Sequence, residues 1–179
     1  MNRLAKNYAD ALFLLARDEG VADEILTQFA QVRKLFDENP DYVRFLFAPN
    51  IPKEERTGAL DEAFSGRIHA YLLNFLKLLS EHGHIFFYQD CELRYRTFYN
   101  LVNDRIEAKV FTALPLRPDQ LQRLKQRLCE LTGKQVDLQN RVDPTVLGGI
   151  RLQYDEHELD GTVRQRLRAV EKTLSETVI

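Results

Sequence analysis

Two different spacings of apolar residues divide this chain near Ile106. Before that point, apolar side chains recur every three or four residues, which is the spacing of an amphipathic helix. After it, segments such as 150–154 alternate apolar and polar residues, as a half-buried strand does. The sequence therefore predicts the α+β class, with residues 1–105 as an all-α helical bundle and residues 106–179 as a small α/β domain.

The first part is expected to hold five or six helices, each with one apolar stripe. Residues that end or interrupt helices separate the stripes, namely Gly20, Asn39-Pro40, Pro49, Ser65-Gly66 and Gly83. Pro52 is expected at the first position of one helix, where its missing N–H costs nothing. The last helix is predicted to run from Phe87 to Ile106, because its apolar residues keep intervals of three and four.

The second part begins with a predicted strand over 109–113. Pro118 then opens a helix that Gly133 closes, and Val136 and Leu138 indicate a second strand. The expected order of elements is strand, helix, strand, strand and helix.

The third strand is predicted over 150–154, directly after the flexible pair Gly148-Gly149. Residues 155–161 are polar enough for a tight connection. From Val163 to Leu174 the apolar residues recur at intervals of four, three and four, which predicts a terminal helix.

The charges are nearly balanced, with 25 Lys and Arg against 27 Asp and Glu for a net charge of −2. Such a chain has no broad positive field, so nucleic acid is not expected as a partner. Cys91 and Cys129 stand alone and are expected to be reduced, and buried or inert. No stretch reaches the roughly 20 apolar residues of a membrane-spanning helix. Without signal or transit character, the chain is expected to begin at its functional N-terminus.

Motifs for catalysis, metals or cofactors are weak throughout. Gly148-Gly149 lacks the Gly-Lys-Ser/Thr of a phosphate loop, and His82 and His84 have no third metal ligand at a suitable spacing. We therefore expect no catalytic residue, no metal and no cofactor. One enzymatic alternative stays open, a small hydrolase or transferase that uses Asp155, His157 and Asp160.

Aromatic residues favour a binding role. The segments 45–47 and 86–88 are rich in phenylalanine, and a small bundle does not hide every ring. The surface left over suits grooves that accept the amphipathic helix of a partner. A free-standing regulatory adaptor is one protein of this kind.

Four regions carry a resemblance to a known family. They read Tyr8-Ala9-x-Ala11-Leu12; Asn74-Phe75-Leu76 with Glu81-His82-Gly83; Thr112-Ala113-x-Pro115-Leu116; and Asp143-Pro144, Leu147-Gly148-Gly149 with Asp160-Gly161-Thr162-Val163. Together they resemble the delta subunit of F-type ATP synthases, which is related to the mitochondrial oligomycin-sensitivity-conferring protein. Thr162 replaces the usual serine but keeps a hydroxyl that can cap a helix, and His84 replaces a common arginine.

The resemblance implies a non-catalytic connector in the stator of the synthase. The helical domain would bind the N-terminal helix of an alpha subunit in the catalytic head, and the C-terminal domain would bind the b subunits of the peripheral stalk. The connector would resist rotor torque while proton flow drives ATP synthesis. It would be a peripheral protein on the cytoplasmic face of the inner (plasma) membrane and reach the membrane only through its partners.

The residues expected to bind these partners fall in two groups. We expect the first and fifth helices to form the head-binding groove from Tyr8, Ala11, Leu12, Leu72, Leu76 and Leu79. The stalk contact is expected around Gly148, Gly149 and the terminal helix that contains Val163 and Leu167.

Overall fold

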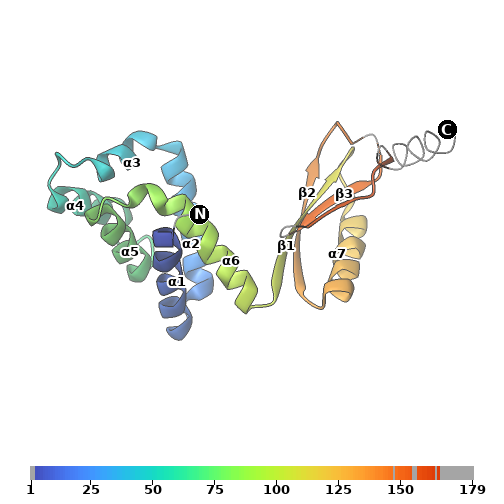
Figure 1. Cartoon of the computed structure of the whole chain (residues 1–179), viewed down its shortest axis with the longest axis horizontal. Coiled ribbons are helices and arrows are strands. Elements are labelled where there is room, and N and C mark those ends of the chain that lie inside the picture. The colour runs from blue at the N-terminus through green and yellow to red at the C-terminus, as the bar shows by residue number, and fades with distance from the viewer. Residues whose placement is uncertain (1–2, 147, 155–156, 164, 166–179) are drawn as a thin grey trace, which may run out of the picture. The chain divides into compact units, whose positions relative to one another are not determined.

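The computed structural model describes residues 3–146, 148–154, 157–163 and 165. The chain forms two compact units, Met1–Tyr99 and Asn100–Ile179, and Figure 1 shows each of them. The described residues of the first unit are helical, and those of the second combine strands with a helix, so the predicted α+β class is confirmed.

Short connections join the helices of the first unit. These helices are α1 (Arg3–Asp18), α2 (Ala22–Glu38), α3 (Pro40–Phe47), α4 (Lys53–Phe64), α5 (Ala70–Glu81), the 3-10 helix η1 (Ile85–Phe87) and α6 (Tyr88–Val102). Gly20 and Gly83 follow α1 and α5 with φ of 72° and 68°, the left-handed geometry that ends helices. α4 begins one residue later than predicted, because Pro52 is its N-cap residue.

α6 is shorter than its apolar spacing predicts. The helix ends at Val102, and Asp104 turns the chain with φ of 48°, so Ile106 lies in the strand that follows. An interval of four residues fits a helix, but any even interval also fits one face of a strand. The prediction of a helix through Ile106 is therefore wrong at its end.

Aromatic rings join the helices of the first unit. Phe13 of α1 lies against Tyr95 and Phe98 of α6, with ring centroids 5.5 and 4.7 Å apart. Phe29 of α2 meets Phe75 of α5 at 5.6 Å and Tyr95 at 6.2 Å, both edge to face. These are favourable geometries for aromatic pairs, so they stabilise the packing of four helices in one core.

α4 places a cation inside this core. Arg56 is 8% exposed, and its Nη1 donates to the carbonyl oxygens of Leu46 at 3.0 Å and Ser80 at 2.6 Å. These carbonyls belong to the last turns of α3 and α5, where the negative end of the helix dipole favours a positive charge. Arg56 thus joins α4 to the ends of two other helices.

The described residues of the second unit form a sheet with strand order β2-β1-β3-β4. Its elements are β1 (Arg105–Thr112), α7 (Pro118–Thr132), β2 (Gln135–Val142), β3 (Ile150–Tyr154) and β4 (His157–Asp160). β1 and β2 are parallel and are connected through α7, whereas the other neighbours are antiparallel. α7 covers one face of the sheet (Figure 1).

The helix α7 and strand β3 are confirmed close to their predicted positions. Gly133 ends α7 with φ of 68°, as expected, and Leu128 packs into the core that the helix shares with the sheet. Leu131 is 70% exposed, so the end of the predicted stripe lies outside this core.

β4 is not predicted from the sequence, which assigns residues 155–161 to a connection. The strand is short and polar, and it is held by antiparallel pairing with β3, including Leu152 with Leu159.

The terminal helix predicted from Val163 to Leu174 lies outside the described residues beyond Gln165. Within the described part of the chain, every helix is too short or too polar to cross a membrane.

Candidate functional site

α1 and α5 lie against each other in the helical unit (Figure 1). The side of α1 that enters the core is made mostly of small residues, together with one leucine and one phenylalanine: Ala5, Ala9, Leu12, Phe13 and Ala16. Small side chains allow neighbouring helices to approach closely. Beyond them, the ring of Tyr8 meets Phe75 of α5 edge to face, with centroids 6.4 Å apart.

One exposed strip of α1 is apolar as well. Leu4 and Leu15 are 45% and 43% exposed, Ala11 is exposed and Tyr8 is half-buried. At 100° per residue these four positions span an arc of about 60° on the helix surface. α1 therefore carries more apolar surface than its contact with the core requires.

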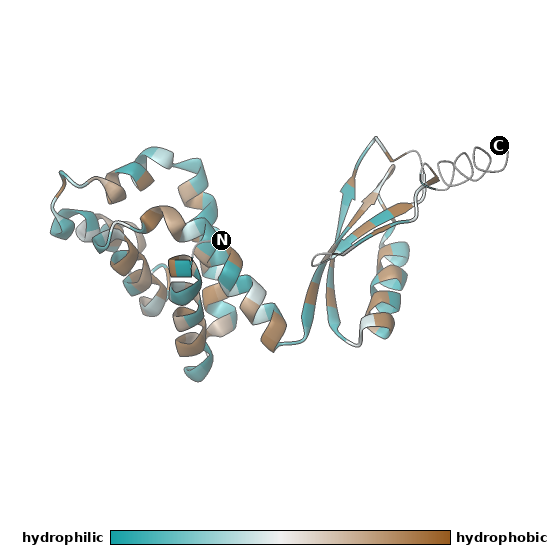
Figure 2. Cartoon of the chain, viewed as in Figure 1, coloured by the Kyte–Doolittle hydropathy of each residue, from teal (hydrophilic) through white to brown (hydrophobic). Residues whose placement is uncertain are grey.

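α5 continues this surface. It is hydrophobic along most of its length, as Figure 2 shows, and not all of that hydrophobic surface is buried. Leu78 is 41% exposed and Tyr71 is half-buried, and both lie within one turn of Phe75, which touches α1. We call this surface the α1/α5 face and define it by Leu4, Tyr8, Ala11, Leu15, Tyr71 and Leu78.

Four residues of the predicted groove belong to the core instead. Leu12 is 4% exposed, and the other three, Leu72, Leu76 and Leu79, are fully buried. Their side chains hold the helices together, so a partner cannot touch them in this structure. The surface is therefore corrected to the α1/α5 face, which keeps Tyr8 and Ala11.

Two histidines lie at one end of the α1/α5 face. The Tyr8 hydroxyl is 3.3 Å from His84 Nδ1, and the rings of His82 and His84 are nearly parallel with centroids 6.2 Å apart. His82 Nδ1 is in turn 2.8 Å from the carbonyl oxygen of Leu78. Among the described residues no cluster of three potential ligands could hold a metal ion.

The second candidate site surrounds Gly148 and Gly149. Gly149 has φ of 81°, and a Cβ added there would lie 2.4 Å from the carbonyl oxygen of Gly161. The carbonyl oxygen of Gly148 accepts a hydrogen bond from the Val163 N–H at 3.0 Å. The glycines thus allow close contact with the segment after β4, where Val163 is 45% exposed. Leu167 lies outside the described residues.

Asp160 and Thr162 have local structural roles. Asp160 Oδ1 accepts from the Thr162 N–H at 2.9 Å, and Thr162 Oγ1 accepts from the Gln165 N–H at 3.3 Å. The second bond confirms that Thr162 can cap a following helix. Asp155, the first residue of the hydrolase alternative, lies outside the described residues.

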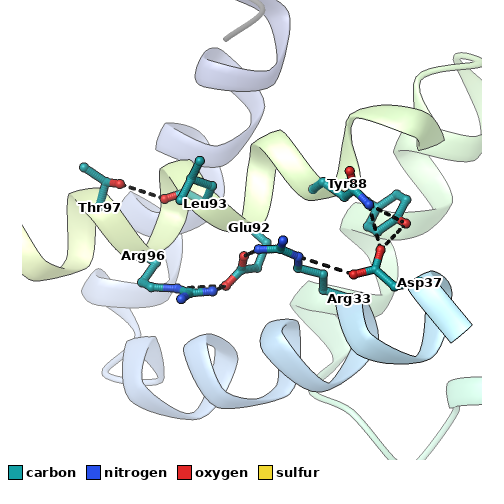
Figure 3. A network of polar contacts seen from close by, with 8 residues as sticks. Arg33, Asp37, Tyr88, Glu92, Leu93, Arg96 and Thr97 are labelled. Atoms are coloured by element: carbon teal, nitrogen blue, oxygen red, sulfur yellow. Dashed lines mark hydrogen bonds and ion pairs between the residues drawn. The ribbon is translucent and has the colours of Figure 1, made fainter. Parts of the chain in front are cut away.

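A charged network joins α2 to α6 (Figure 3). Glu92 is fully buried and pairs with Arg33 at 2.7 Å and with Arg96. Asp37 Oδ1 accepts from the Tyr88 hydroxyl at 2.6 Å, and this hydrogen bond is the main reason why the pKa of Asp37 lies below its usual value. The pairs Arg33 with Asp37 and Glu92 with Arg96 have the i,i+4 spacing of a helix, but sequence spacing gives no sign of the contacts that join the two helices.

Comparison with known proteins places these features in context. A protein-family model described as "ATP synthase delta (OSCP) subunit" matches residues 4–174. Relatives named ATP synthase subunit delta include one from Clostridioides difficile (strain 630), 30% identical over 179 residues, with 99% of each chain covered. Another, from Gloeobacter violaceus, is 32% identical over 168 residues, covering 93% of this chain and 91% of the relative.

Solved structures show the same fold. A chain in the Toxoplasma gondii mitochondrial ATP synthase hexamer superposes with a TM-score of 0.73. Its sequence is 17% identical, and the match covers 97% of this chain and 98% of that one.

Proposed function

The chain belongs to the ATP synthase delta (OSCP) subunit family, a non-catalytic component of F-type ATP synthases, and we propose that it is the connector between catalytic head and peripheral stalk. In this role it holds the head against rotor torque while proton flow drives ATP synthesis. A connector of this kind requires two binding surfaces and a stiff structure between them. It places the chain at the cytoplasmic face of the inner membrane, which the chain reaches through its partners.

The α1/α5 face is the observation that carries the head contact. Leu4, Leu15 and Leu78 are each more than 40% exposed and flank a pair of packed helices. An amphipathic helix that lies along such a face buries apolar residues at its i, i+3, i+4 and i+7 positions. The N-terminal helix of an alpha subunit is our proposed occupant.

The stalk contact is proposed for the second unit. Gly148, Gly149 and Val163 bring the turn before β3 next to the segment after β4, where Val163 is exposed. Together with Leu167 they are our proposed contact for the b subunits. Residues 1–105 would thus serve the head and residues 106–179 the stalk. Two sites on one chain raise the effective concentration of each partner for the other.

Calorimetric titration of the full chain with a synthetic peptide of the alpha subunit's N-terminal helix tests the head contact. We expect one-to-one binding with a negative heat-capacity change, the mark of buried apolar surface. The variant Ala11→Glu places a charge in the middle of the α1/α5 face and should weaken binding by about tenfold or more, which is about 1.4 kcal/mol.

Ala30→Glu is the matched control, because Ala30 is exposed on α2, a helix that contributes no residue to this face. It should bind as the wild-type chain does. Equal affinity of the Ala11→Glu and wild-type chains would place the head contact elsewhere.

A further inference from the structure

The sheet of the second unit has a polar face opposite α7. Along β1, Ile106, Ala108 and Val110 are buried in the core that α7 covers. Side chains alternate along a strand, so Lys109 and Phe111 belong to the opposite face. The residues of this face are exposed or half-buried in the described part of the chain.

The strand register brings two arginines beside Phe111. Arg141 of β2 and Arg151 of β3 are its neighbours on either side. The Arg151 guanidinium lies over the ring, with its carbon 4.7 Å from the centroid. Arg151 also pairs with Asp143 at 2.9 Å and Glu158 at 4.0 Å, so its charge is already used within the chain.

Lys109 and Arg141 differ from Arg151 because their charges are not paired within the described part of the chain. Both are exposed, and within the described residues neither forms an ion pair or a side-chain hydrogen bond. The nearest acidic residues of the face do not neutralise them, since Glu107 accepts from Asn100 Nδ2 at 3.1 Å and Glu158 faces Arg151. Two free cations beside a half-exposed aromatic ring are therefore open to carboxylates from outside the chain.

We propose that Lys109, Phe111 and Arg141 form a docking surface for an acidic segment of the stalk partner. We call it the β1/β2 basic surface. A carboxylate-rich segment would pair with the two cations and lay an apolar side chain on Phe111. The identity of the partner rests on the proposed connector function, whereas the chemistry of the surface rests on the residues alone.

Nucleic acid fits this surface less well than an acidic protein does. A polynucleotide presents a long row of phosphates and calls for many cations. Here Glu107 and Asp137 are paired side by side on the same face, two residues along the strands from Lys109. They limit the basic area to a short patch, which suits a few carboxylates on a folded partner.

The test uses the full chain and the purified soluble portion of the b subunits. Lys109→Glu/Arg141→Glu should lower the affinity about tenfold or more, and wild-type binding should weaken as salt is raised, because exposed charges are screened. Arg123→Glu/Lys125→Glu is the matched control, with the same charge change on exposed residues of α7. It should bind like the wild-type chain, and circular dichroism should show both variants folded.

The outcomes separate this inference from the proposed function. Equal binding by the wild type and Lys109→Glu/Arg141→Glu would overturn the docking surface and leave the connector role standing. Absence of binding by the wild-type chain would overturn both. Single-stranded oligonucleotide that binds the wild type and competes with the b subunits would overturn the acidic-protein assignment.

Discussion

Glu92 Oε2 accepts a hydrogen bond from Arg33 Nη1 at 2.7 Å, although the Glu92 side chain is only 1% exposed. Arg96, one turn further along α6, pairs with the other carboxylate oxygen (Figure 3). A buried carboxylate is tolerated because two guanidinium groups compensate its charge. The ion pair of Arg33 with Glu92 joins α2 to α6 in the unit that carries the α1/α5 face.

Removing this carboxylate should destabilise the helical unit strongly. Glu92→Ala leaves Arg33 and Arg96 facing each other without their shared anion, and we expect a loss of about 3 kcal/mol. This is the low end for a broken buried pair, since both arginines are about a third exposed. Urea unfolding followed by circular dichroism measures the loss. Glu38→Ala, which breaks only an exposed pair with Lys34, should change stability by about 0.5 kcal/mol or less.

The stability of the helical unit should depend on the protonation of Asp37. Hydrogen bonds from Tyr88 and then Gln89 lower the pKa of Asp37 in the folded chain. The unfolded chain then binds more protons, so this contribution is present above about pH 4 and is lost as the pH falls through the folded pKa. Unfolding curves at a series of acidic pH values measure it.

Two variants check the assignment to Asp37. Asp37→Asn removes the titrating group, and Tyr88→Phe removes the hydroxyl that donates to it at 2.6 Å. Both should flatten the dependence of stability on acidic pH. A slope equal to that of the wild type in both variants would assign the acid sensitivity to other carboxylates.

The two cysteines should differ in reactivity. Cys91 is fully buried and its Sγ donates to the carbonyl oxygen of Ala5 at 3.6 Å, whereas Cys129 is half-buried. Burial raises the pKa of the Cys91 thiol to about 12, so almost no thiolate forms at pH 8. In a Cys129→Ser chain, iodoacetamide should label Cys91 only when denaturant is present. Rapid labelling of the folded variant would show that α6 opens readily.

The apolar stripes of the helices were the most predictable part of the fold. The least predictable part was which apolar residues of each stripe are buried in the core. Leu4, Leu12 and Leu15 are equally apolar, and only the packing of α1 on its neighbours buries Leu12 and leaves the other two exposed. A wide apolar arc signals both a core and a binding face. For this reason the sequence predicts a groove on the two helices that carry the proposed α1/α5 face, but four of the residues it assigns to that groove lie in the core.

Features that depend on pairing between distant residues could not be predicted. β4 has one apolar residue, Leu159, and is defined by its bonds to β3. Arg56 and Glu92 are buried charges that each have a partner on another helix, and composition assigns such residues to the surface. The β1/β2 basic surface likewise needs the register of β1 with β2, which places Phe111 opposite Arg141.

Gly149 should tolerate a side chain less well than any glycine in open space. An alanine there keeps φ near 81°, a left-handed backbone that costs about 1–2 kcal/mol, and its Cβ would lie 2.4 Å from the carbonyl oxygen of Gly161. Gly133→Ala is the matched control in the same unit, with φ of 68° and nothing within 4 Å of the added Cβ. We expect Gly149→Ala to lose roughly 3 kcal/mol and Gly133→Ala roughly 1 kcal/mol in urea unfolding.

The difference between the two variants isolates the close contact from the backbone strain. If the segments around Gly149 and Gly161 must stay together to bind the stalk, Gly149→Ala should also weaken binding of the b subunits, whereas Gly133→Ala should not. Equal losses of stability in the two variants would mean that the backbone at Gly161 moves away from the added Cβ at position 149 without a loss of folding free energy. Stalk binding unchanged in a folded Gly149→Ala chain would remove Gly148 and Gly149 from the proposed contact.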